Sequence, residues 1–174
     1  IVSPTVKAYA VKQFNCSSAV GLQFENEGGS GTAGSHWEKT VMGFDMMTGV
    51  QNYKMMISVA TLGFFQDTGF YIVDMTQAED TPWGLNEGCG FLNSNCSTSY
   101  REFAPSSNWT CSSDYLLKLQ GSKGSLSDTC YQYEIYQGRN CPVGQTVKAT
   151  LWGESGGPTS RCFNGFIKSN GAPF

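Results

Sequence analysis

The sequence predicts an α+β protein in which a helical domain is followed by a disulfide-rich β/loop domain. Apolar residues recur at helical spacing in the first half of the chain, whereas apolar and polar residues alternate in one stretch near its end. The cysteines also concentrate late, because six of the seven lie at or after position 89. We place the boundary near residue 90, which divides the chain into residues 1–90 and 91–174.

Two helices are expected in the first domain. Ser3 and Pro4 are typical of an N-cap followed by proline in the first helical turn, and regularly spaced apolar residues carry the helix to about Cys16. A longer helix is expected over residues 52–67, because apolar side chains recur there with a period of about 3.6 residues. The Thr-Gly pair that follows is expected to end it.

The remaining segments follow simpler patterns. Residues 26–36 are rich in glycine and lack the Gly-Lys-Ser/Thr ending of a phosphate loop, so a turning or flexible connector is expected there rather than a nucleotide site. The apolar residues 70–73 are expected to pack on the longer helix. In the second domain, residues 146–152 alternate in polarity, which is typical of a half-buried strand.

Composition and cysteine spacing predict an extracellular or cell-surface protein that has passed through the secretory pathway. The charged fraction is 14% and there is no basic block, which excludes nucleic acid as a favoured partner because phosphates require clustered Lys and Arg. No C-x-x-C pair occurs, so a disulfide framework is favoured over a cysteine zinc knuckle. The longest apolar run, residues 55–65, is shorter than the roughly 20 residues of a membrane span. Three N-x-S/T sequons predict glycosylation at Asn15, Asn95 and Asn108.

The chain contains a single histidine, His36, and a lone histidine is usually a structural or surface residue. Here the segment from Gly28 to Lys39, Gly-Gly-Ser-Gly-Thr-Ala-Gly-Ser-His-Trp-Glu-Lys, resembles the third zinc-ligand region of the leishmanolysin family. Met47-Thr48-Gly49, which begins eleven residues after His36, resembles the Met-turn of that family. Further matches in the same order lie at residues 14–16, 65–71, 82–84, 88–89, 141–142 and 160–163. The resemblance is dense from about residue 1 to 92 and patchy after that.

The resemblance implies a metzincin-like zinc endopeptidase that hydrolyses peptide bonds of polypeptide substrates. In that arrangement a helix carrying His-Glu-x-x-His supplies two imidazoles and a glutamate general base. His36 would be the third ligand, and Met47 would form an apolar floor beneath the imidazoles. Residues 1–90 would then be the C-terminal part of a metzincin-like catalytic domain, followed by the cysteine-rich domain of residues 91–174.

The sequence departs from the family pattern in one respect, because it contains no His-Glu-x-x-His motif. One imidazole cannot hold a catalytic zinc ion, which normally needs three protein ligands. We therefore expect this chain to be inactive alone, with one zinc ion completed by two histidines and a general-base glutamate from an upstream portion of the same protein. Glu38 lies near His36 in sequence, but no catalytic role is assigned to it.

Disulfide pairing is not settled by counting, because even six cysteines allow 15 connectivities. The resemblance implies a bridge between Cys16 and Cys89, and a local bridge between Cys111 and Cys130 is plausible. One cysteine of the seven is free or pairs outside the chain, and it is expected among Cys96, Cys141 and Cys162.

Two alternatives to the peptidase interpretation stay open. A leishmanolysin-like fold could serve as a catalytically inactive surface adhesion or structural glycoprotein, since fold does not fix function. More remotely, Gly153-Glu154-Ser155-Gly156-Gly157-Pro158 resembles the nucleophile motif of trypsin-like proteases and would make Ser155 the nucleophile of a serine hydrolase. Glu154 stands where that motif has aspartate, so a turn after the predicted strand is favoured.

Overall fold

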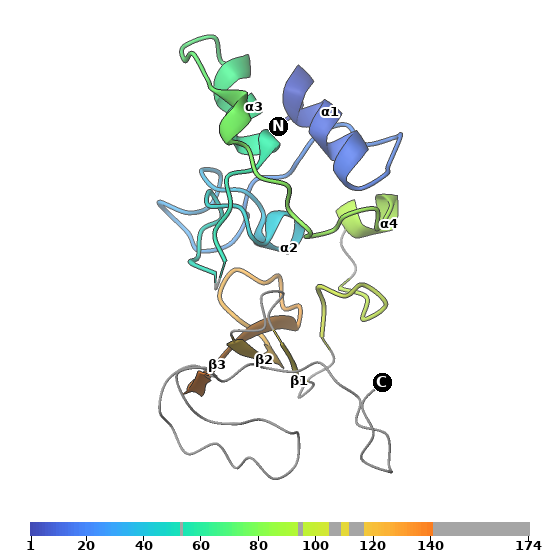
Figure 1. The fold of residues 1–174 in the computed structure, drawn as a ribbon, viewed down its shortest axis with the longest axis vertical. Coiled ribbons are helices and arrows are strands. Elements are labelled where there is room, and N and C mark those ends of the chain that lie inside the picture. The colour runs from blue at the N-terminus through green and yellow to red at the C-terminus, as the bar shows by residue number, and fades with distance from the viewer. Residues whose placement is uncertain (53, 94–95, 105–108, 112–116, 141–174) are drawn as a thin grey trace. The chain divides into compact units, whose positions relative to one another are not determined.

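A computed structural model describes residues 1–52, 54–93, 96–104, 109–111 and 117–140 of the chain (Figure 1). It divides into two compact units, of which unit 1 comprises Ile1–Phe103 with Lys123–Tyr131 and unit 2 comprises Ala104–Ser122 with Gln132–Phe174. Helices occur in unit 1 and a small sheet in unit 2, which agrees with the α+β class. The domain boundary near residue 90 stays a prediction.

Helix α1 spans Pro4–Gln13, which confirms the first predicted helix and its start, although it ends before the predicted Cys16. Proline occupies its first turn, where a missing N–H costs nothing because that group has no helical partner. Val6 and Ala10 are fully buried on its inner face. Helix α1 packs against α3 (Figure 1), and the backbone amide and hydroxyl of Thr5 donate to the Asp67 carboxylate at 2.8 and 2.7 Å.

Helix α3 spans Val59–Asp67, so the predicted start near residue 52 is wrong. Met56 instead lies in extended backbone, because its amide donates to Phe44 O and its carbonyl accepts from Met46 N, both at 2.8 Å. Ser58 then caps the helix by accepting a hydrogen bond from the Thr61 amide at 3.2 Å. The predicted end is confirmed, since the helix stops at Asp67 and Thr68 is its C-cap.

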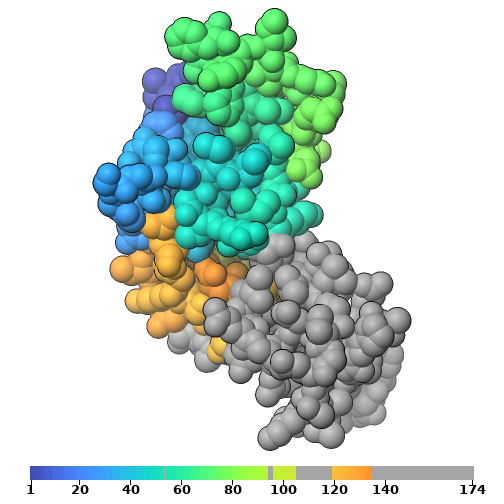
Figure 2. All heavy atoms as spheres, turned by 90° about the vertical axis from the view of Figure 1, so that its left-hand side faces the viewer, coloured from blue at the N-terminus to red at the C-terminus, as the bar shows by residue number. Residues whose placement is uncertain are grey.

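The apolar stretch after α3 packs on that helix only in part, because Tyr71 contacts it whereas Phe70 and Ile72 project into solvent, which corrects the prediction for residues 70–73. Gly69, with φ of 72°, turns the chain out of the helix. Phe70 and Ile72 are then 86% and 106% exposed, whereas the Tyr71 ring contacts Phe65 of α3, with ring centroids 5.2 Å apart. The green segment that follows α3 stands at the surface of unit 1 (Figure 2). It continues into a single 3-10 turn, η1, at Met75–Gln77.

The core of unit 1 is aromatic and is reinforced by a disulfide. Phe91 stacks between Phe14 and Phe103, with ring centroids 5.6 and 5.7 Å apart. Two short helices, α2 at Lys39–Met42 and α4 at Cys89–Leu92, border this core. The structure joins Cys16 to Cys89, as the resemblance implies, and so ties the end of α1 to the start of α4.

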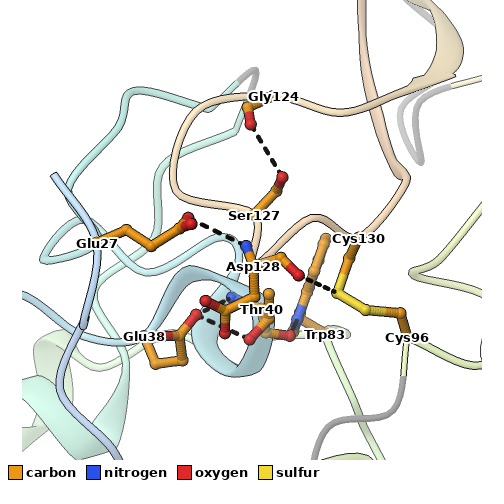
Figure 3. The surroundings of a disulfide bond; sticks show 9 residues. All are labelled: Glu27, Glu38, Thr40, Trp83, Cys96, Gly124, Ser127, Asp128 and Cys130. Carbon is orange, nitrogen blue, oxygen red and sulfur yellow. Dashed lines mark hydrogen bonds between the residues drawn. A yellow bond between two sulfur atoms is a disulfide. The ribbon is translucent and has the colours of Figure 1, made fainter.

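A second disulfide, Cys96–Cys130, contradicts the expected local bridge between Cys111 and Cys130 and shows that Cys96 is not the unpaired cysteine (Figure 3). Cys130 lies in the segment Lys123–Tyr131, which belongs to unit 1, whereas Cys111 lies in a strand of unit 2. The segment is held in unit 1 by the Asp128 amide, which donates to Glu27 Oε2 at 3.1 Å. Proximity along the chain therefore predicted the wrong partner.

Unit 2 contains a three-stranded antiparallel sheet in the order β1-β2-β3, formed by Trp109–Cys111, Leu117–Ser122 and Gln132–Asn140. Leu119 on β2 is buried and pairs with Ile135 on β3. The predicted strand at residues 146–152 lies outside the described residues.

Candidate metal-ligand site

His36 closes the glycine-rich loop of residues 26–36, which is a series of tight turns. The loop is pinned at its base, because the Glu25 amide donates to His36 O at 2.9 Å and the Gly34 amide donates to Glu25 O at 2.8 Å. Gly28 adopts φ of +80°, and a Cβ there would lie 2.9 Å from Thr32 Cβ. The glycine spacing thus serves loop geometry, as the prediction of a turning connector requires.

The His36 imidazole is half-buried and oriented from one side. Its Nδ1 lies 3.2 Å from the Thr32 carbonyl oxygen and 3.0 Å from Ser35 Oγ. When Nδ1 carries the proton it donates to Thr32 O, and Nε2 keeps a free lone pair. This is the form that metal-binding histidines take, with the second ring nitrogen anchored to a carbonyl. In the described part of the chain Nε2 has no hydrogen-bond partner, so the donor fits a metal ligand.

The predicted Met-turn runs beside this histidine. The amide of Trp37, the next residue after His36, donates to Met47 O at 2.9 Å, and Trp37 pairs with Thr48 in a parallel bridge. Gly49 lies against the imidazole, because a Cβ placed on it would be 3.8 Å from His36 Cγ. Met47 itself is partly buried and packs on the core of unit 1. The two motifs are therefore neighbours in space as well as in sequence.

Glu38 is a buried helix cap. Its Oε1 accepts from the Thr40 amide and hydroxyl at 3.0 and 2.8 Å at the start of α2, and Figure 3 shows this pair. Burial raises the pKa of the Glu38 carboxyl, the Thr40 hydrogen bonds oppose that effect, and the nearby charges of Glu25 and Asp128 add to it. These contacts give Glu38 a structural role and leave it without the setting of a water-activating base.

Sequence reasoning missed one residue at this site, Asp45. It lies inside the apolar run Phe44-Asp45-Met46-Met47 and is 1% exposed. Its Oδ1 accepts from the Met47 amide at 2.8 Å, and its carbonyl accepts from the Thr48 amide at 3.1 Å. A lone acid within an apolar run is a signal of a buried, hydrogen-bonded carboxylate.

Of the other predicted site residues, some lie within the described part of the chain and some do not. Asn15 is exposed and adopts φ of 51° directly after α1. Asn95, Asn108, Cys141, Ser155 and Cys162 lie outside the described residues. Within the described ranges, no group of three or more His, Cys, Asp or Glu side chains is placed to hold a metal ion. No helix in that same part of the chain has the length and apolar character that crossing a membrane requires.

Comparison with known proteins gives consistent matches. A family model described as leishmanolysin matches residues 1–139. A leishmanolysin-like peptidase of Caenorhabditis elegans is 38% identical over 96 residues, which cover 55% of this chain and 14% of that protein. The leishmanolysin-like peptidase of Drosophila melanogaster is 35% identical over 96 residues, again 55% of this chain and 14% of the relative. The leishmanolysin of Leishmania donovani is 38% identical over 96 residues, or 55% and 16%. The chain thus spans only 14 to 16% of the length of these relatives.

Proposed function

This chain belongs to the leishmanolysin family of peptidases, and we propose that it forms the part of a zinc-dependent endopeptidase that supplies the third metal ligand, His36. The observation that carries the proposal is the anchored imidazole. Nδ1 faces the Thr32 carbonyl at 3.2 Å, so Nε2 is free to bind a cation. Zinc, when bound, lowers the pKa of its water and polarises a peptide carbonyl.

The described residues contribute orientation and support. Ser35 and Thr32 hold the ring, and the Trp37 amide, bonded to Met47 O at 2.9 Å, ties the ligand segment to the Met-turn. Met47 is the apolar floor of the proposed site. Because the sequence contains no His-Glu-x-x-His motif, the proposal assigns two further imidazoles and the general base to polypeptide outside this sequence. The chain alone is then inactive.

We also propose that the protein lies outside the cell or on its surface. Two disulfides, Cys16–Cys89 and Cys96–Cys130, are typical of an oxidising compartment. The exposed Asn15 sequon is an acceptor for an N-linked glycan in that compartment. Asn95 and Asn108 are proposed as further acceptors from sequence alone.

The test is chelator-sensitive proteolysis by the complete protein that contains this chain. Cleavage of an unfolded polypeptide should stop on zinc removal and return when zinc is added. His36→Gln should lower kcat/KM by more than the roughly 10- to 100-fold that loss of a group orienting a ligand costs. Met75→Leu, in the turn η1 where no residue is buried, is the control and should cleave like the wild type.

Proteolysis that persists after zinc removal would contradict the proposal. Absence of any proteolysis, together with a degraded motif in the upstream polypeptide, would instead support the inactive adhesion or structural glycoprotein.

A further inference from the structure

Asp45 is the centre of a buried hydrogen-bond network that reaches three segments of unit 1. Met47 N donates to its Oδ1 at 2.8 Å, and Ser58 donates to its Oδ2 through the backbone amide at 3.2 Å and also through the hydroxyl. The Thr61 hydroxyl lies 2.8 Å from both carboxylate oxygens. One carboxylate therefore binds the Met-turn and the first turn of α3 at once.

Thr61 extends the network to the segment that carries His36. The indole Nε1 of Trp37 donates to Thr61 Oγ1 at 2.8 Å, which commits the Thr61 proton to Asp45. Trp37 is 3% exposed and follows His36 directly, so its orientation and that of the ligand segment are coupled. The chain of contacts runs from Asp45 through Thr61 and Trp37 to the residue beside the imidazole.

The chemistry of this network depends on an acceptor with two oxygens. A buried carboxylate is costly unless it is hydrogen-bonded, and here its partners are all donors, two of them backbone amides. In Asp45→Asn an NH2 group would replace one of the two carboxylate oxygens. In one orientation of the amide this donor would face Ser58 and Thr61, and in the other it would face the Met47 amide. The network would then lose at least one connection without a change in side-chain volume.

We propose that Asp45 is a positioning residue for the metal site, which fixes the Met-turn and the His36 segment relative to each other. This inference rests on the proposed function. Asp45 acts through Met47, Thr61 and Trp37 and does not touch the metal ion or the substrate. Loosening it lets the imidazole leave the orientation that the Thr32 carbonyl defines, so zinc binds more weakly.

The test measures zinc affinity of the complete protein by competition with a chromophoric chelator. Asp45→Asn should weaken zinc binding by about 10-fold or more, in the range seen when a group orienting a ligand is lost. Asp74→Asn makes the same chemical change at an exposed cap, where Asp74 accepts from the Thr76 amide and hydroxyl at 3.0 and 2.6 Å. It should bind zinc like the wild type. Val6→Ala, a buried truncation in α1, should lower the Tm without weakening zinc binding.

A second pair of variants covers the case in which Asp45→Asn does not fold. Thr61→Val removes the hydroxyl that links Asp45 to Trp37, whereas Thr61→Ser keeps it. Zinc binding should weaken several-fold in Thr61→Val and return in Thr61→Ser. Asp45→Asn or Thr61→Val with a lowered Tm but wild-type zinc affinity would overturn the inference. His36→Gln, measured in the same series, separates this inference from the proposed function. If Asp45→Asn keeps wild-type zinc affinity while His36→Gln loses affinity, only the role of Asp45 is overturned. If His36→Gln also keeps wild-type affinity, the proposed function fails as well.

Discussion

Replacing Gly49 with alanine tests how closely the Met-turn fits beneath the glycine-rich loop. A Cβ at this position would lie 2.5 Å from Leu126 Cδ1 and 2.6 Å from Thr32 Cγ2, well inside contact distance. Overpacking of this kind costs about 1–3 kcal/mol, and the stiffer unfolded chain of alanine returns about 0.4–1 kcal/mol. The net loss of folding free energy should therefore be about 1–2 kcal/mol.

Gly49→Ala should also disturb the orientation of the His36 imidazole. The added Cβ forces Thr32 to move, and the Thr32 carbonyl anchors the imidazole at 3.2 Å. Zinc affinity should fall by roughly 10-fold. Urea denaturation would measure the stability change as a shift in midpoint at constant slope. Thr32→Ser removes one of the two methyl groups that Gly49→Ala would meet and keeps the carbonyl, whereas the Leu126 contact stays, so the double variant should recover part of both losses.

A matched control is Gly29→Ala. Gly29 has φ of +66° and no atom within 4 Å of an added Cβ, so this variant carries backbone strain without overpacking. It should lose stability, but Thr32→Ser should not rescue it. The reasoning is refuted if Gly49→Ala unfolds within about 0.5 kcal/mol of wild type, the range of neutral surface changes, or if Thr32→Ser leaves its defect unchanged.

Three further predictions concern stability. Removal of Cys16–Cys89, which closes 73 residues of sequence, should cost about 4 kcal/mol in urea denaturation of the double serine variant. Burial raises the pKa of the Glu38 carboxyl above the ordinary glutamate value of 4.5, so the folded wild type loses stability as pH rises from 4.5 through the raised pKa. Glu38→Gln, which does not titrate, should flatten the dependence of the Tm on pH in this range. Asp67→Asn should remove an opposite dependence, because the nearby Ser3 hydroxyl and the hydrogen bonds from Thr5 lower the Asp67 pKa, and the stability that they contribute is lost as pH falls from 3.8.

Each of these has its own contradicting result. A double serine variant that unfolds within about 1 kcal/mol of the wild type would show that the disulfide does not restrain the unfolded chain, which is the basis of its predicted effect. If the Tm of Glu38→Gln and that of the wild type change in parallel above pH 4.5, the Glu38 pKa is not raised in the folded protein. Asp67→Asn with the wild-type acid profile would remove the Thr5–Asp67 contact from the account of acid stability.

The sequence predicted elements that depend on local chemistry. Helix α1 begins at Pro4 because proline suits a first turn, and α3 ends at Asp67 because Gly69 can adopt a positive φ. The start of α3 was predicted too early, because its position depends on Asp45, which binds Ser58 from 13 residues away. A periodic pattern contains no information about such a contact.

In the candidate site, too, the features that a sequence motif carries could be predicted, whereas those that depend on distant contacts could not. The spacing of His36 and Met47 was informative through family resemblance, and the structure brings their backbones together at Trp37. Asp45 was missed because its importance follows from partners distributed over residues 47–61 rather than from any motif. The exposure of Phe70 was also beyond sequence reasoning, since an apolar run reads the same whether it is packed or projects into solvent.

X-ray absorption at the zinc edge of the complete protein would show whether His36 binds the metal. We expect three imidazole nitrogens at about 2.0–2.1 Å from the metal in the wild type, and one fewer in His36→Gln. An unchanged zinc environment in His36→Gln, or a wild-type protein that binds no zinc, would contradict the assignment of His36 as a ligand.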